Sequence, residues 1–177
     1  MSVDLKLGEV ICDAATAKLQ AGMSARVARI NAQASDFQLD DIPNDRYHLG
    51  GIPHAGLPSG PAVIVAEGPM EIAPDTEGPH SFIAQTQLFV IVYADDASRA
   101  TLDRKLKRYL RAVIETLWDD PPMQKLDGAS PNGIGTAAVF NLVPLRTRPG
   151  PTSEPDTEST AWRSWMGVIF LAEQVEG

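Results

Sequence analysis

Apolar residues recur at helical spacing in the middle of the chain, between residues 99 and 118. They follow one another at intervals of three or four positions and so form one continuous apolar face over about five turns. This pattern predicts an amphipathic helix whose core-facing residues are Leu102, Leu106, Tyr109, Leu110, Val113, Ile114 and Leu117. Asp95, Asp96 or Ser98 can cap its start, and Pro121-Pro122 prevents its continuation.

A second helix is predicted near the start of the chain, over residues 7–33, which are rich in Ala, Leu, Lys, Arg and Gln. Its narrow apolar stripe repeats every four residues, at Leu7, Ile11, Ala15 and Leu19. Gly22 is expected to break or cap this helix. Ser24 is then expected to start a second segment, which carries Val27 and Ile30.

Four stretches have the composition and spacing of β-strands. They are Ala62–Ala66 with Met70–Ile72 after an interruption at Gly68-Pro69, Ser81–Tyr93, Ala137–Arg146 and Ala161–Ala172. The second stretch alternates in its first half and is apolar on both faces from Leu88 to Tyr93, and the last stretch carries apolar side chains on both faces. Such strands need cover on both sides of their sheet.

The predicted order of elements is therefore helix, strand, strand, helix, strand, strand. The simplest arrangement is an α+β fold in one domain over residues 1–177, with a four-stranded, mostly antiparallel sheet and both helices on one face. No predicted helix remains for the other apolar face, so we expect a subunit contact to cover it. Two long segments rich in Gly, Pro and polar residues are expected to be extended arms: a first arm at about 36–61 and a second arm at 147–160.

Composition limits the classes of function. The chain has 177 residues, with 15 Lys and Arg against 23 Asp and Glu, which gives a net charge of −8. No apolar run reaches the ~20 residues that span a bilayer, and Met1–Gly8 lacks the pattern of an export signal, so we expect a soluble cytoplasmic chain with no membrane partner. The single cysteine excludes an internal disulfide, and the acidic balance argues against strong binding of nucleic acid.

Candidate catalytic and metal-binding residues are few. His48 and His54 are six residues apart in the first arm, so they could share a metal with Asp41 or Asp45, but exposed loop histidines account for them more simply, as for His80. Cys12 lies beside apolar helix positions and is expected to be a buried thiol rather than a nucleophile.

Paired carboxylates occur at Asp40-Asp41, Asp95-Asp96 and Asp119-Asp120. Helix capping explains the second pair, and the third simply precedes Pro121. The chain also lacks the phosphate-loop, nucleophile-elbow and zinc-protease motifs. We therefore expect no enzyme, no cofactor and no bound metal.

The central helix has a basic outer face, formed by Arg99, Arg104, Lys105, Lys107, Arg108 and Arg111. A solvated helix face is the simpler interpretation. The more specific hypothesis is a docking surface in which Arg104, Lys107, Arg108 and Arg111 meet Glu154, Asp156 and Glu158 of the second arm, in the same chain or in a neighbouring subunit. Nucleic acid is a third possibility, but no aromatic residue interleaves with these cations.

The chain resembles tail terminator (tail-completion) proteins and related neck proteins of long-tailed bacteriophages. The matching stretches are Ala25-Arg-Val-Ala-Arg-Ile-Asn31, Tyr47-His-Leu-Gly-Gly51, Phe89-Val-Ile-Val-Tyr93-Ala-Asp-Asp96 and Arg108-Tyr-Leu-Arg-Ala-Val-Ile-Glu-Thr-Leu117, followed by a closing pair of strands. The resemblance covers most of the chain and is one of pattern rather than of a short invariant motif.

The resemblance implies a structural virion protein without catalytic activity. It implies a ring, typically a hexamer, that caps the tail tube, joins it to the head, and contacts the tail tube protein and the head–tail connector. Packaged DNA would pass through the lumen without specific binding. The alternatives are another neck or head–tail adaptor component, a small ferredoxin-like dimeric enzyme or ligand-binding protein, and a regulatory adaptor that binds through the basic helix.

Overall fold

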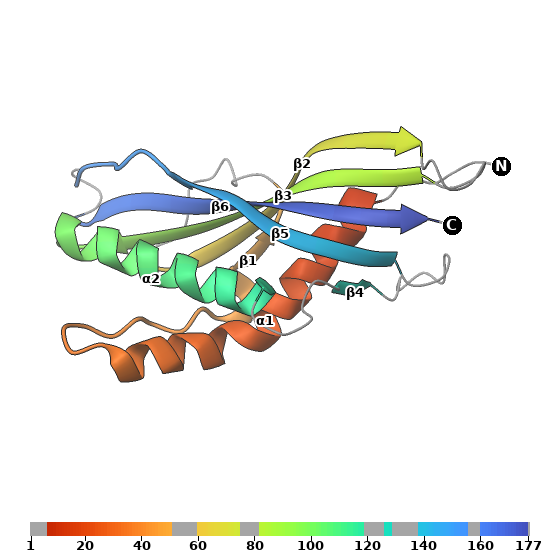
Figure 1. Ribbon diagram of the computed structural model, residues 1–177. Coiled ribbons are helices and arrows are strands. Elements are labelled where there is room, and N and C mark those ends of the chain that lie inside the picture. Colours follow the sequence, from red (N-terminus) through yellow and green to blue (C-terminus); the bar gives the residue numbers. More distant parts are fainter. Residues whose placement is uncertain are drawn as a thin grey trace.

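The computed structural model describes residues 7–50, 60–74, 82–118, 126–128, 138–155 and 160–176. These residues form an α+β fold, as predicted (Figure 1). Its elements are α1 (Leu7–Gln33), the short 3₁₀ helix η1 (Asn44–Arg46), β1 (Tyr47–Leu49), β2 (Ala62–Pro74), β3 (Phe82–Asp96), α2 (Arg99–Trp118), β4 (Leu126–Gly128), β5 (Ala138–Pro149) and β6 (Trp162–Glu176). Neither α1 nor α2 is long and apolar enough to cross a membrane.

The strands form a single sheet in the order β1-β2-β3-β6-β5-β4. The four long strands at its centre are antiparallel to one another, which confirms the predicted arrangement. The sheet has six strands rather than four, because β1 pairs in parallel with β2 and β4 pairs with the start of β5. Each of these added strands has three residues, which is too short to show an alternating pattern in the sequence.

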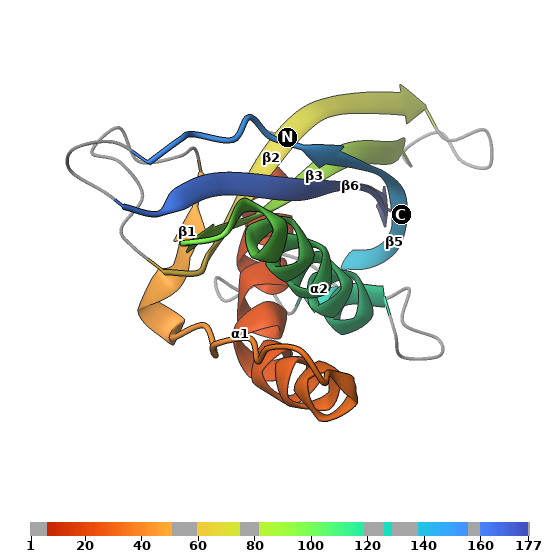
Figure 2. The same ribbon diagram turned by 90° about the vertical axis from the view of Figure 1, so that its left-hand side faces the viewer.

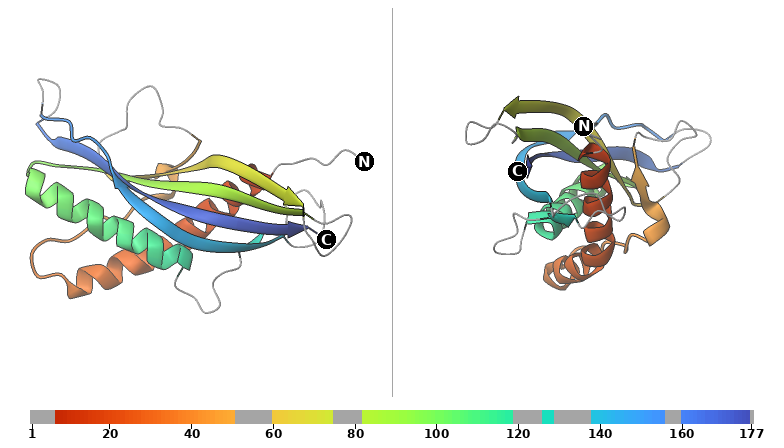
Figure 3. Two further views of the ribbon diagram at one scale, coloured as in Figure 1. Left: turned by 45° about the horizontal axis from the view of Figure 1, so that its top comes forward. Right: turned by 90° about the vertical axis from the view of Figure 1, so that its right-hand side faces the viewer.

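Both helices lie on the same face of the sheet (Figures 1 and 2). Alternate residues of the central strands point toward them, and their buried side chains form the core with the apolar face of α2. From the sheet, these residues are Val63 and Val65 of β2, Leu88, Val90 and Val92 of β3, Leu142 of β5, and Val168 and Phe170 of β6. None of the described helices lies over the other face of the sheet (Figure 3).

The expected break of the first helix at Gly22 is wrong. α1 continues from Leu7 to Gln33, although it bends midway (Figures 1 and 2). A Cβ atom at residue 22 would lie 2.8 Å from Cγ2 of Thr116 in α2. The glycine therefore lets the two helices approach closely, which is a packing requirement that the sequence of one helix cannot show.

The expected interruption at Gly68-Pro69 is a bulge rather than the end of a strand. β2 runs from Ala62 to Pro74, and its pairing with β3 shifts register between Glu67 and Met70. One continuous strand therefore replaces the two short pieces that the sequence pattern indicated.

The described part of the first arm packs against the helices. Leu39 and Ile42 are each only 4% exposed and belong to the core. The side chain of Asn31 in α1 holds this segment at both polar groups of Leu39: its Oδ1 accepts from the backbone nitrogen at 2.7 Å, and its Nδ2 donates to the carbonyl at 2.9 Å. Residues 36–50 are thus part of the domain, while 51–59 lie outside the described residues.

The close approach at Gly22 can be tested by substitution. Gly22→Ala adds a methyl group against Thr116 Cγ2, so we expect the free energy of unfolding to fall by about 1–3 kcal/mol. In a Thr116→Ser background that methyl contact is absent, and the same change should be neutral or stabilising by up to about 1 kcal/mol because alanine favours helix. Urea titrations measure both effects, with Ala21→Gly as the control for helix propensity in the same turn. Equal effects of Gly22→Ala in the two backgrounds would contradict this packing.

Candidate assembly surfaces

The basic face of α2 holds the first arm in place. Asp36 accepts from Arg104 Nη1 at 2.9 Å through Oδ2 and from Arg108 Nη2 at 2.7 Å through Oδ1. The hydrogen bond from Arg108 is the main reason that the pKa of Asp36 lies below its ordinary value. Two of the four predicted interface cations therefore already have a carboxylate partner in their own chain.

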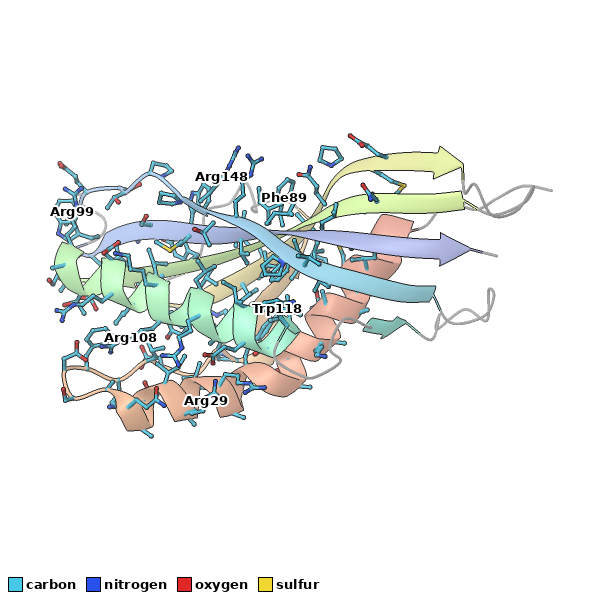
Figure 4. The ribbon with its side chains drawn as sticks, in the orientation of Figure 1. Arg29, Phe89, Arg99, Arg108, Trp118 and Arg148 are labelled. Carbon is cyan, nitrogen blue, oxygen red and sulfur yellow. The ribbon has the colours of Figure 1, made fainter. Side chains whose placement is uncertain are left out.

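The aromatic ring of Phe37 strengthens this contact. The guanidinium carbon of Arg108 lies 4.1 Å from the ring centroid, and that of Arg104 lies 5.5 Å from it. Arg108 Nη1 also donates to the carbonyl of Phe37 at 3.2 Å. Arg108 thus binds the first arm by charge, by a backbone hydrogen bond and by cation–π contact (Figure 4).

The other two predicted cations pair within α2. Lys107 Nζ lies 2.7 Å from Asp103, and Arg111 Nε lies 2.7 Å from Glu115, both one helical turn apart. Glu115 also binds Arg29, which connects α2 with α1. The basic face of α2 is therefore largely neutralised by acidic groups of the same chain.

The second arm begins as part of the sheet. The backbone nitrogen of Gly150 donates to the carbonyl of Trp165 at 2.8 Å, and Ser153 forms a bridge with Arg163. Glu154 follows and is exposed, while Asp156 and Glu158 lie outside the described residues. A contact between these three acidic residues and α2, in the same chain or in a neighbouring subunit, stays a prediction.

The face of the sheet away from the helices is apolar at its centre. Register places Ile64, Ile91 and Ile169 on it, together with the aromatic residues Phe89, Tyr93 and Trp165. The rings of Phe89 and Trp165 lie over Gly68 and Gly150, where a Cβ atom would overlap them. Phe89 and Trp165 are half-buried in the single chain. Figure 4 shows Phe89 on this side of the sheet, which we call the outer face.

An open groove of about 770 Å³ runs between α2 and β5. Its apolar lining consists of Leu110, Ile114, Trp118, Pro149 and Met166. Its charged residues Asp103, Lys107, Arg111 and Glu115 are the same groups that pair along α2. The groove therefore has an apolar floor, and its charged residues pair with one another along α2. Such a groove is better suited to bind a segment of protein than the substrate of a reaction.

The positions of the candidate catalytic groups in the fold argue against a catalytic role. Cys12 is buried, and burial raises the pKa of its thiol to about 11, with smaller contributions from Glu67 and Asp13. A thiol with that pKa is neutral near pH 7 and is a poor nucleophile. His48 lies in β1, whereas His54 and His80 lie outside the described residues. Within the described ranges, no three His, Cys, Asp or Glu side chains are grouped as metal ligands.

Of the three cap candidates, Ser98 caps α2: its Oγ accepts from the backbone nitrogen of Thr101 at 3.4 Å, whereas Asp95 and Asp96 end β3 and bind other backbone groups. Asp95 Oδ2 accepts from the backbone nitrogen of Gly60 at 3.1 Å, and Asp96 Oδ1 accepts from that of Ser98 at 2.8 Å. Asp96 also pairs with Lys105 at 2.7 Å. The pair Asp119-Asp120 lies outside the described residues.

Sequence reasoning missed Asp36 and Phe37 as the partners of the basic helix. They are 72 and 71 residues away from Arg108 along the chain, so no local pattern connects them. The one available signal was their position: an acidic and an aromatic residue follow the first helix closely, where the chain must turn back and pass over the helices.

Comparisons with known proteins give a weak structural neighbour. No protein-family model matches the chain, and no curated protein matches it. A solved structure described as "Virion of native gene transfer agent (GTA) particle" contains a chain with 21% sequence identity and a TM-score of 0.40. The match covers 90% of this chain and 95% of that one.

The contact between Asp36 and α2 predicts a pH-dependent loss of stability. Asp36→Asn keeps the shape of the side chain but removes its charge. Because the folded-state pKa of Asp36 is lowered, its carboxylate stabilises the fold above the unfolded-state pKa of about 3.9 and loses this effect as the pH falls through the folded value. We expect the difference in unfolding free energy between parent and variant to be largest near pH 7 and to shrink steadily toward about pH 2.

Urea titrations at a series of pH values measure this difference. Asp40→Asn is the matched control, since Asp40 is an exposed aspartate of the same arm and no ion pair is formed by its side chain within the described residues. A difference between Asp36→Asn and the parent that does not change with pH would contradict the ion pair.

Proposed function

We propose that this chain is a structural protein of a tailed bacteriophage particle, and specifically a tail terminator. In this proposal, copies of the chain form a ring, a hexamer as in the family that the sequence resembles. The ring closes the tail tube and joins it to the neck and head. Its partners are other copies of itself, the tail tube protein and the head–tail connector, and its location is the virion.

The one-sided cover of the sheet carries this proposal. The described helices pack on one face only (Figure 3). Register places the half-buried side chains of Phe89, Ile91, Trp165 and Leu171 on the outer face, beside Ile64, Tyr93 and Ile169, which are already buried in the single chain. Apolar side chains left partly exposed on an uncovered face are typical of a protein–protein interface. Full burial of an exposed side chain of this size contributes roughly 1.5–3 kcal/mol, and each half-buried one contributes part of this, so several of them together would hold a ring.

The surroundings of the candidate catalytic groups support a role without catalysis. The buried thiol of Cys12 and the carboxylates of Asp95 and Asp96, which bind backbone nitrogens and Lys105, are each accounted for by the fold. The net charge of −8 also suits a ring through which DNA moves, because a negative lumen repels the phosphate backbone. Another neck or head–tail adaptor component would use the same surfaces and is the alternative within the same class.

Assembly and tail completion test the proposal together. We expect the purified parent chain to have the mass of a ring by light scattering, to show rings in negative-stain images, and to complete tails that lack it so that they join heads. A chain that is monomeric alone and in the presence of tail tubes would contradict the proposal. So would a ring that leaves tail completion unchanged.

A substitution on the outer face tests the observation on which the proposal depends. Leu171→Glu places a charge among the apolar residues of that face, and we expect ring assembly to weaken about 10- to 100-fold, which corresponds to roughly 1.4–2.8 kcal/mol. Gln33→Glu, at an exposed position of α1, is the control with the same added charge. Circular dichroism establishes that both variants fold. Unchanged assembly of Leu171→Glu would exclude the outer face as a subunit contact.

A further inference from the structure

The exposed apolar side chains of the described residues lie at the edges of the sheet. The large ones are Leu49 at 53%, Trp118 at 49%, Val143 at 38% and Leu145 at 51% exposed. Leu49 is in β1, at one edge. Val143 and Leu145 are in β5, near the opposite edge, and Trp118 lines the groove beside that strand. The most exposed large apolar side chains of the described residues therefore lie at or beside these two edges.

The edge formed by β5 is open and basic. β4 pairs only with residues 138–140 of β5, so from Asn141 onward the described strand has a neighbour on one side alone, which is β6. Arg146 and Arg148 are exposed there and form no ion pair with any described residue. Figure 4 shows Arg148 on the outer side of the sheet, with Trp118 at the end of α2. These five residues, Trp118, Val143, Leu145, Arg146 and Arg148, are called the basic edge.

The edge formed by β1 is open among the described residues, and the segment that leads into it is acidic. β1 pairs with β2 on one side, and the sheet ends on its other side. The segment that leads into β1 exposes Asp40, Asp41 and Asp45. Asp41 accepts a hydrogen bond from Ser24, whereas the side chains of Asp40 and Asp45 form no ion pair with the described residues. Leu49 and these three aspartates are called the acidic edge.

We propose that the basic edge of one copy binds the acidic edge of the next copy. Val143, Leu145 and Trp118 would pack against Leu49, while Arg146 and Arg148 would pair with Asp40 and Asp45. Contact between two different surfaces of one chain is heterologous, and such contacts close into rings when the rotation between copies allows it. The inference rests on the proposed ring and names the surfaces that build it.

Opposite charges favour the contact of a basic edge with an acidic edge over the contact of two like edges. Two basic edges would bring four arginines together, and two acidic edges would bring several aspartates together, each arrangement at a cost of like-charge repulsion. The partner is a second copy of this chain, because the chain itself supplies both complementary surfaces on opposite edges of one sheet. The open backbone of β5 can add main-chain hydrogen bonds to the contact.

Paired charge reversal tests the contact. In one variant, Arg146→Glu and Arg148→Glu make both edges acidic; in the other, Asp40→Lys and Asp45→Lys make both edges basic. We expect each variant alone to lose at least about 10-fold in assembly, measured by light scattering and native mass spectrometry. An equimolar mixture should assemble again with the two variants in equal numbers, because each acidic edge then meets a basic edge.

Single reversals outside both edges are the controls. Asp13→Lys and Arg99→Glu change exposed charges of the helices and should leave assembly within about twofold of the parent. Thermal unfolding confirms that every variant is folded. Recovery in the mixture distinguishes a direct contact from misfolding, since two misfolded chains would not rescue each other.

The outcomes separate the two proposals. If the parent forms a ring and the reversals do not weaken it, or if the mixture fails to recover, the edge contact is wrong while the ring stands. If the parent is monomeric both alone and on tail tubes, the ring and the edge contact are both wrong. If the variants weaken assembly but the outer-face variant Leu171→Glu does not, the edges rather than the outer face hold the ring.

Discussion

The helix-facing surface of β3 and β6 is the contact on which the rest of the molecule depends. Val90, Val92, Val168 and Phe170 form an apolar surface that α2 covers with its single apolar face. α1 then packs beside α2, where Gly22 permits close approach. The first arm is held in turn by Asp36 against α2. The first arm thus depends on α2, as α1 does, and α2 depends on the sheet. All of these elements pack on the same side of the sheet.

This one-sided construction leaves the chain with two kinds of surface. On the helix side, acidic groups of the chain pair with most of the cations of α2, so the charge of that face is largely compensated. On the sheet side and at its edges, some apolar side chains are partly or largely exposed, and Arg146 and Arg148 form no ion pair with a described residue. The surface whose charges pair within the chain therefore serves folding, and the surfaces whose charges are unpaired among the described residues are available for assembly.

Long periodic elements could be predicted from the sequence because their patterns are local. The bounds of α2 at Arg99 and Trp118 match those of the predicted helix, and the four long strands lie where alternating or β-branched residues indicated them. The strands β1 and β4 could not be found, since three residues give no period.

The remaining misses concern residues whose partners are distant in sequence. From the sequence alone, Gly22 is predicted to break the helix. Its actual role, close packing against Thr116, becomes evident only in the folded structure. Arg104 and Arg108 indicated a site for acidic residues, and Asp36, rather than a residue of the second arm, occupies it in the described structure. Pairing across 68 and 72 residues is decided by packing, which a single sequence does not display.

The register shift in β5 has a consequence for the length of that strand. Pairing with β6 shifts between Pro144 and Arg146, so Leu145 is an extra residue in the ladder. If Leu145 instead continued a regular ladder, the alternation that starts from the core residue Leu142 would turn Arg146 and Arg148 toward the helices and Thr147 outward. The bulge thus decides which side of the sheet carries positive charge. Deletion of Leu145 would restore a regular ladder with both arginines still outward, whereas pairing of Leu145 in the ladder would invert the polarity of two surfaces at once.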